Sequence, residues 1–340
     1  MQEKDSQTSE KQPFYLTRNE SFGVALPADD YLHRAVNATV SDDSLTETQY
    51  FGLEIPEHQI HVNAYLWHHV NLHTVTGGIW AWQGQQLQLQ CEIFDMHAWM
   101  HDRVLDNDLH RYRLDNGYGV EVVEPLNKHR ITYADPARKN SVELEVTAVN
   151  PPIMFGDGQH FEQVMRVTGE LVLRGKRYSV DSYNVRDRSW GKPRPEVSMS
   201  LPPVGWKTGV FGDDFSFNCT ALDDHRLMPE WQSQFAVPEE KLLSGGWIYR
   251  DGEVNVVTRC LKRTTRDPQS LLPTQIEMDI TDSKRRDYHM TGKVLAASDW
   301  LVQPMLRWAS VSIHWECEGR SAFGEAQEAQ WGDFTRAFKR

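Results

Sequence analysis

Hydrophobic and polar residues alternate with a period of two along most of this chain. Val142, Leu144 and Val146 alternate with glutamate and threonine, and residues 276–280 and 311–317 repeat the pattern. Successive side chains of a strand point to opposite faces of a sheet, so each such segment has one buried face. The same alternation over residues 87–93 predicts a further strand there.

Tight turn signals separate these segments. Asn116-Gly117, Arg174-Gly175 and Asp251-Gly252 each stand between β-forming residues, which is typical of hairpins. Sustained helical periodicity is missing. Strands joined by such short turns are antiparallel, because a parallel pair needs a longer crossover connection. The sequence therefore predicts an all-β protein built from barrels or sandwiches.

The length of 340 residues suits two domains. Residues 1–20 begin with a polar stretch of mixed charge and predict a disordered arm. Two prolines and two glycines interrupt the alternation between residues 150 and 158. We place the boundary there, with an N-terminal β domain over 21–157 and a C-terminal β domain over 158–340.

Charge and hydropathy narrow the classes of partner. The formal net charge of −12 argues against a nucleic-acid partner, since binding to that polyanion needs a cationic face. No apolar run approaches the length that spans a membrane, and the first residues lack the apolar core of a signal peptide. We expect a cytoplasmic protein without a membrane span, and a homodimer is left open.

Signatures for metals and cofactors are missing from the sequence. Seven histidines stand between residues 58 and 101, but their spacing matches no metal-binding motif. The chain has no glycine-rich phosphate loop, dinucleotide fingerprint or nucleophile elbow. We expect neither a metal nor a cofactor.

Charged residues concentrate in the middle of the chain, over residues 181–194. Asp181, Arg186, Asp187, Arg188 and Trp190 are types that a sheet interior rarely takes unless each is paired or hydrogen-bonded. The cluster is either a buried polar network or a functional site.

The two aspartates are candidate proton donors. Asp181 and Asp187 are six residues apart, so an uninterrupted strand would point both to the same side. A carboxyl group facing an apolar cavity has a raised pKa, which makes it a usable acid near neutral pH. Asp181 is the preferred acid because it precedes the arginines. The alternative is that Asp187 forms a structural ion pair with Arg186 or Arg188.

The same segment carries a family resemblance. Residues 186–191, Arg-Asp-Arg-Ser-Trp-Gly, resemble the Arg-Asp-His-Ser-Trp-Gly signature of the carotenoid 1,2-hydratase (hydroxyneurosporene synthase) and AttH-like superfamily. Residues 126–152 and 323–331 are similar to that family's late N-terminal half and closing strand. This chain has Arg188 where the family usually has histidine. The resemblance implies two lipocalin-like β-barrel halves and chemistry on hydrophobic isoprenoid-like or polyketide-like molecules.

The chain is rich in large aromatic side chains, with 12 tryptophans. Tyr65 and Trp67 share one strand face, and Trp80 and Trp82 share another. Ring faces can stabilise the cation that forms when an alkene is protonated. Aromatic stripes at this spacing are also ordinary core packing, which is the alternative for each ring.

Together these features predict a cofactor-independent acid-base enzyme, a hydro-lyase or an isomerase. Its substrate would be a hydrophobic isoprenoid, steroid or polyketide-like molecule, which a hydratase, dehydratase, isomerase or cyclase would convert. Asp181 or Asp187 would donate the proton, Arg186 would orient the carboxylates, and Tyr183 and Trp190 would shape the cationic region.

We expect aromatic residues and histidines to bind the substrate, namely Trp67, His68, His69, Trp80 and Trp82. The alternative function is a carrier that uses the same pocket without chemistry. A carrier needs an apolar cavity but no carboxyl group of raised pKa, so the position of the aspartates distinguishes the two functions.

Overall fold

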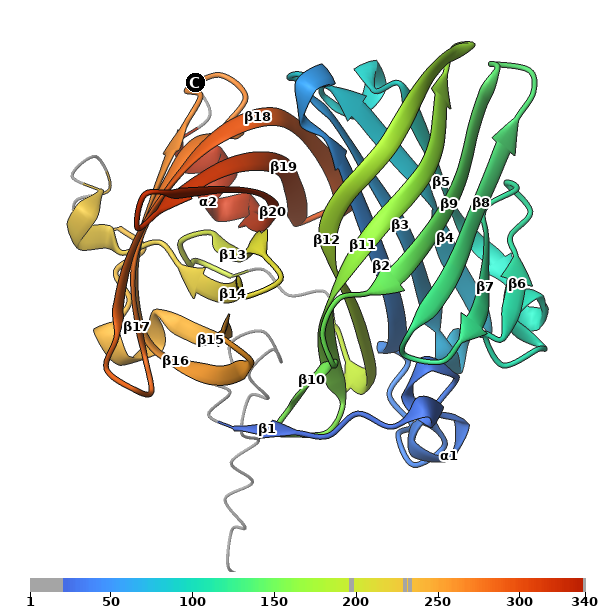
Figure 1. The fold of residues 1–340 in the computed structure, drawn as a ribbon, viewed down its shortest axis with the longest axis horizontal. Coiled ribbons are helices and arrows are strands. Elements are labelled where there is room, and N and C mark those ends of the chain that lie inside the picture. The colour runs from blue at the N-terminus through green and yellow to red at the C-terminus, as the bar shows by residue number, and fades with distance from the viewer. Residues whose placement is uncertain (1–20, 196–198, 229–230, 232–233, 339–340) are drawn as a thin grey trace, which may run out of the picture.

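The computed structural model describes residues 21–195, 199–228, 231 and 234–338. These residues form two antiparallel β units that lie side by side (Figure 1). The first is a curled open sheet, and the second is a closed barrel. The predicted all-β class with two barrel-like halves is confirmed. The predicted arm over residues 1–20 lies outside the described residues.

The first sheet has the strand order β5-β4-β3-β2-β12-β11-β9-β8-β7-β6, and β10 pairs with both β11 and β1. Its strands are β1 (Phe22–Gly23), β2 (Leu45–Ile55), β3 (Ile60–His69), β4 (Thr74–Gln83), β5 (Ile93–His101), β6 (Arg111–Arg113), β7 (Gly119–Glu124), β8 (Lys128–Asp135), β9 (Asn140–Ala148), β10 (Ile153–Phe155), β11 (His160–Leu173) and β12 (Lys176–Pro193).

The barrel closes where its first strand pairs with its last. Its strands are β13 (Val204–Gly212), β14 (Phe215–Leu222), β15 (Leu243–Arg250), β16 (Glu253–Arg266), β17 (Pro273–Asp282), β18 (Asp287–Gln303), β19 (Leu306–Cys317) and β20 (Arg320–Trp331). The helices α1 (Arg34–Asn37) and α2 (Gly332–Phe338) are short. Within the described part of the chain, no helix has the length and apolar character needed to cross a membrane.

Alternation within single strands explains how the units meet. In β19, Val311 and Ile313 pack in the barrel core, while Ser310 and Ser312 hydrogen-bond to residues of the first sheet. β2 is buried along its whole length because both of its faces are covered. Its Phe51 packs in the core of the first sheet, whereas its outward-pointing side chains contact the barrel. The contact between the units is therefore a second buried region.

The predicted division between residues 157 and 158 falls inside the first sheet. β11 pairs with β9, and β12 pairs with β2, so residues 160–193 complete this sheet. The change from sheet to barrel lies between Pro193 and Val204. The prolines and glycines of residues 150–158 instead flank the short β10, where the chain reverses between β9 and β11. A reversal and a domain linker have the same local composition.

The strand predicted over residues 87–93 is wrong for most of its length. Residues 88–90 form a 3-10 turn, β5 begins only at Ile93, and Leu89 is 97% exposed. The segment contacts the barrel instead, where the backbone N–H of Gln88 donates to Asp299 Oδ1 at 3.0 Å. Contact between the units overrides the local alternation here.

Candidate functional site

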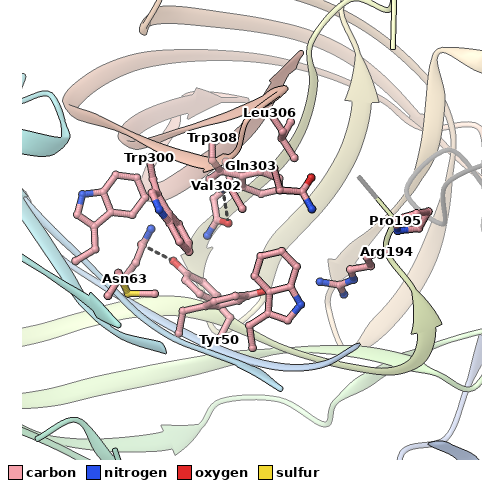
Figure 2. Close-up of a pocket in the computed structure, with 14 residues that line it drawn as sticks. Tyr50, Asn63, Arg194, Pro195, Trp300, Val302, Gln303, Leu306 and Trp308 are labelled. Carbon is pink, nitrogen blue, oxygen red and sulfur yellow. Dashed lines mark hydrogen bonds between the residues drawn. The ribbon is translucent and has the colours of Figure 1, made fainter. Parts of the chain in front are cut away.

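A cavity lies between the two units (Figure 2). Its volume of about 120 Å³ is several times that of one water molecule in the liquid, about 30 Å³. Aromatic and aliphatic side chains make up most of its lining. The first sheet contributes Tyr50, Asn63, Tyr65, Trp67, Trp80 and Met96, the following segment contributes Arg194 and Pro195, and the barrel contributes Trp300, Val302, Gln303, Leu306, Trp308 and Gln327.

The register of the first sheet explains why these rings gather. Tyr50 of β2 lies opposite Tyr65 of β3, and Asn63 of β3 lies opposite Trp80 of β4. Side chains two residues apart share a face, so Asn63, Tyr65 and Trp67 all point from β3 towards the barrel. That face would meet water in an isolated sheet, but here the barrel covers it.

A polar network adjoins the apolar lining. The phenolic O–H of Tyr50 has two acceptors, Asn63 Oδ1 at 2.8 Å and Glu325 Oε2. His61 Nε2 lies 2.8 Å from Asn63 Oδ1 and 3.2 Å from Glu325 Oε2. The amide N–H of Asn63 donates to Ser310 Oγ at 3.0 Å. Tyr50 thus connects the cavity to a buried carboxyl group of the barrel.

Two further carboxyl groups lie between the units. Burial raises the pKa of Asp187, and the charges of Glu162 and Glu325 add to this effect, whereas His160 and Arg194 oppose it. In the described part of the chain, Asp187 Oδ1 is shielded from solvent and has no hydrogen-bond partner.

Glu54 is in a similar environment. Burial and the nearby Glu325 raise its pKa well above the ordinary value, and its Oε2 accepts a hydrogen bond of 2.9 Å from Ser312. Carboxyl groups in such surroundings favour the protonated form and can donate a proton near neutral pH.

Asp187 lies directly behind the cavity wall. It stands opposite Tyr50 in the pairing of β12 with β2, and its charge affects the pKa of both Tyr50 and Tyr65. Both tyrosines line the cavity, while Asp187 is not among the lining residues of the described chain. Asp187 therefore adjoins the cavity lining beside its tyrosine neighbours without being part of it.

The structure separates the other predicted proton-transfer residues from this site. Asp181 is on the surface, 61% exposed, and forms an ion pair of 2.9 Å with Arg166. The hydrogen bond from Arg166 lowers the pKa of Asp181, which is opposite to the direction that an acid needs. Arg186 does not orient Asp187, because the two point to opposite faces of β12 and Arg186 bonds to Asp30 at 2.6 Å.

Tyr183 and Trp190 also lie away from the cavity lining. Tyr183 packs against a cluster that joins the two units, and its hydroxyl lies 3.5 Å from Asp213 Oδ1. Trp190 is buried in the first unit, stacked on His33 with ring centroids 3.6 Å apart. Two indoles of the barrel, Trp206 and Trp247, instead hydrogen-bond across the units and donate to Glu162 at 2.6 and 2.5 Å.

Among the predicted substrate-binding residues, the structure places Trp67 and Trp80 in the cavity lining. Trp82 is fully buried beside Trp80 and the ring of His61. The ring of His69 lies tilted against that of Trp67, with centroids 4.9 Å apart, and burial lowers the pKa of His69 to about 4, with the charge of His68 adding to the effect. His68 itself points to the opposite face of β3, where it lies 3.6 Å from Asp102.

Sequence reasoning missed the polar network of Tyr50, Asn63 and Glu325, and it missed the role of Arg194 in the cavity lining. One signal pointed to Glu325, because residues 323–331 are similar to a family strand. Tyr50 and Asn63 lie in strands whose alternation does not distinguish a solvent face from a face between units.

Fold and cavity together define a two-unit all-β protein of lipocalin-like architecture with an aromatic pocket between its units. The chain belongs to the family described as a domain of unknown function, DUF7064, which matches residues 26–332. A search of curated proteins finds no match to this sequence.

Two solved structures resemble the whole chain. A protein provisionally described as AttH from Nitrosomonas europaea has a TM-score of 0.60 and 10% identity, over 90% of this chain and 96% of that one. Kievitone hydratase from Nectria haematococca has a TM-score of 0.53 and 8% identity, over 94% of this chain and 98% of that one. At these identities the likeness concerns the fold.

Proposed function

We propose that this chain is a cofactor-independent acid-base enzyme of the hydratase or dehydratase class, which acts on a hydrophobic substrate. One observation carries the proposal: Asp187, a carboxyl group of raised pKa, stands next to Tyr50, which lines an apolar, indole-walled cavity. The fold likeness to a protein named a hydratase supports the same class. Isoprenoid-like, steroid-like or polyketide-like substrates remain a prediction from the sequence resemblance to carotenoid 1,2-hydratases.

The lining suits a reaction that passes through a cation. The indoles of Trp67, Trp80 and Trp300 present electron-rich faces to a bound apolar molecule. Such faces stabilise positive charge on a carbon without reacting with it, and the cavity limits the access of bulk water. Protonation of a bound alkene, or loss of water from a bound alcohol, gives a carbocation. The aromatic lining can stabilise this carbocation without forming a covalent bond to it.

Tyr50 is the residue that contacts the reacting atoms, and the carboxyl groups act through it. In the hydration direction, Tyr50 relays a proton in one step: it gives its own proton to an alkene carbon as it takes the proton of Asp187, so that no tyrosinate forms, since burial raises the pKa of Tyr50. A water molecule then attacks the cation, and the proton that this water loses goes to Glu325. Return of that proton to Asp187 restores the starting state, and dehydration is the reverse sequence. Asn63, which lines the cavity and accepts a hydrogen bond from Tyr50, would orient the water through its second amide N–H.

Isotope exchange tests this proposal across a range of candidate substrates. A panel of isoprenoid alkenes and tertiary alcohols is incubated with the protein in D₂O or H₂¹⁸O, and mass spectrometry measures the isotope gained. We expect Tyr50→Phe and Asp187→Asn each to lower the exchange rate by roughly a hundredfold or more. Asp181→Asn is the matched control, because Asp181 occupies the same face of the same strand but is exposed.

Exchange that survives in both Tyr50→Phe and Asp187→Asn would contradict the proposal.

The carrier function is favoured by one observation, that Asp187 stands behind the lining and not in it. A carrier would bind compounds of the panel, with quenching of tryptophan fluorescence, but would leave their isotopes unchanged.

A further inference from the structure

A second carboxyl group lies next to Asp187, on the neighbouring strand. Glu162 of β11 stands opposite Asp187 in the pairing of β11 with β12, so both side chains point towards the barrel. Glu162 is 1% exposed. Side chains directly opposite each other in an antiparallel pair have Cβ atoms about 4.5 to 5.5 Å apart. Two negative charges so close together in a buried site repel strongly, so this pair of carboxyl groups favours a state that holds one proton.

The hydrogen bonds of Glu162 identify it as the charged member of the pair. The indole N–H of Trp206 donates to its Oε1 at 2.6 Å, and that of Trp247 donates to its Oε2 at 2.5 Å. His160 Nε2 lies 3.2 Å from Oε1. A carboxylate accepts through both oxygens, whereas a protonated carboxyl group must donate from one of them. An indole N–H can only donate, so both tryptophans select the carboxylate form of Glu162.

Asp187 has the opposite surroundings. In the described part of the chain, its Oδ1 is shielded from solvent and has no hydrogen-bond partner. Burial raises the pKa of Asp187, His160 opposes this rise, and Glu162 adds to it. The titratable groups that face Asp187 are His160, Glu162, Tyr50, Tyr65, Arg194 and Glu325. Two neighbouring carboxyl groups in such different environments divide into a proton donor and a fixed charge.

We propose that Glu162 is a positioning residue, a fixed anion that keeps the proton of this carboxyl pair on Asp187. Both indole partners of Glu162 belong to the barrel, Trp206 to β13 and Trp247 to β15. Trp206 also packs against Tyr50, with ring centroids 5.9 Å apart. The contact between the units therefore completes the acid as well as the cavity. The part of Glu162 in catalysis rests on the proposed function, whereas its effect on Asp187 does not.

Infrared spectroscopy measures which carboxyl group holds the proton. Aspartate that carries ¹³C in its side-chain carboxyl group shifts the C=O band of aspartic acid and leaves that of glutamic acid in place. The band that is lost in Asp187→Asn identifies Asp187. We expect the wild-type band to titrate with a midpoint above the ordinary value of 3.8. Glu162→Gln removes the neighbouring charge and should lower this midpoint by at least about one pH unit.

Two matched variants separate the charge of Glu162 from general damage. Glu162→Asp keeps the charge, so its midpoint should stay closer to the wild type than that of Glu162→Gln. Glu170 lies on the same face of β11 but is 43% exposed and paired with Arg177. Glu170→Gln should therefore leave the midpoint unchanged, because solvent screens that charge.

Trp247→Phe tests the inference even if Glu162→Gln fails to fold. This variant removes one of the two indole donors and keeps both carboxyl groups. The carboxylate form of Glu162 is then less favoured, so part of the proton should move from Asp187 to Glu162. The labelled aspartic acid band should weaken, and a glutamic acid band should gain the same intensity.

The pH dependence of isotope exchange measures the consequence for the reaction. Exchange needs the protonated form of Asp187, so its rate falls as the pH rises through the pKa of Asp187 in the folded protein. Glu162→Gln should move this fall to lower pH by the same amount as the infrared midpoint. A purely structural loss would instead lower the rate at every pH without moving the profile.

An unchanged infrared midpoint in folded Glu162→Gln would overturn the inference, and so would an equal shift in Glu170→Gln. A wild-type proton that appears only in a glutamic acid band would overturn it as well. A shifted midpoint in Glu162→Gln, in a protein that exchanges no isotope with any substrate of the panel, would support the carboxyl pair and contradict the proposed function. The two failures are therefore distinguishable.

Discussion

The two faces of β12 place charged side chains in opposite environments. Towards the interior of the first sheet, Arg186 pairs with Asp30 at 2.6 Å and Arg188 pairs with Glu47 at 2.7 Å. Towards the barrel, Asp187 stands between these arginines in sequence but contacts neither, and its neighbours include the carboxyl groups of Glu162 and Glu325.

The pKa values follow from this difference. Burial alone would raise the pKa of Asp30 and of Glu47, but the adjacent arginines outweigh it, so that the pKa of Asp30 is lowered and that of Glu47 falls to about 2. For Asp187, burial outweighs the charges of His160 and Arg194, and its pKa is raised. Paired carboxylates keep a fixed charge and support structure, whereas the raised pKa of Asp187 favours its protonated form.

The largest effect is expected from breaking a paired carboxylate. Asp30→Asn leaves Arg186 buried without its counter-charge, so the free energy of unfolding should fall by about 3 to 5 kcal/mol. Urea denaturation at pH 7 measures this change. Asp187→Asn serves as the control on the other face, and it should lose far less. Equal losses of unfolding free energy in Asp30→Asn and Asp187→Asn would contradict the assignment of paired carboxylates to one face of β12 and an unpaired carboxyl group to the other.

The pH dependence of stability should have opposite signs on the two faces. The raised pKa of Asp187 means that its protonated form stabilises the folded state below the unfolded value of about 3.8. That contribution is lost as pH rises through the higher folded value. The wild type loses this contribution as the pH rises, but Asp187→Asn has no carboxyl group to titrate. The melting temperature of Asp187→Asn should therefore rise relative to that of the wild type as the pH increases from 4 to 8.

Glu47 provides the opposite case. Its contribution is present above the unfolded value of 4.5 and is lost as pH falls towards about 2. Glu47→Gln should therefore be most destabilised at neutral pH and approach the wild type in acid. Thermal melts of both variants across pH 2 to 8 make the test, and parallel profiles would show that the assigned environments are wrong.

The smallest effect is expected at the surface. Asp181 shares a strand face with Asp187 but is exposed, and its partner Arg166 is exposed as well. Solvent screens such a pair, so Asp181→Asn should leave melting temperature and isotope exchange close to wild type. A marked loss of exchange in this variant alone would return Asp181 to the role first predicted for it.

The site was only partly predictable from the sequence. The motif around Asp187 and the tryptophans at positions 67 and 80 were recognised, because residue type and strand alternation are local properties. The sequence could not distinguish Asp181 from Asp187 as the acid. The two are six residues apart and share one face of one strand, and they differ only in what covers them. Glu325 lies far along the chain from Tyr50 and joins the site only through contact of the two units.

The sequence by itself determined the all-β class, the antiparallel pairing and the presence of a charged segment in a strand, since each depends on neighbours within a few residues. Only the tertiary structure decided where the first sheet ends, which face of β12 meets cations, and which carboxyl groups have a raised pKa. The physical reason is that desolvation and charge pairing depend on groups brought together from distant parts of the chain. The alternation of apolar and polar residues indicates that a strand face is buried, but it does not indicate which residues cover that face.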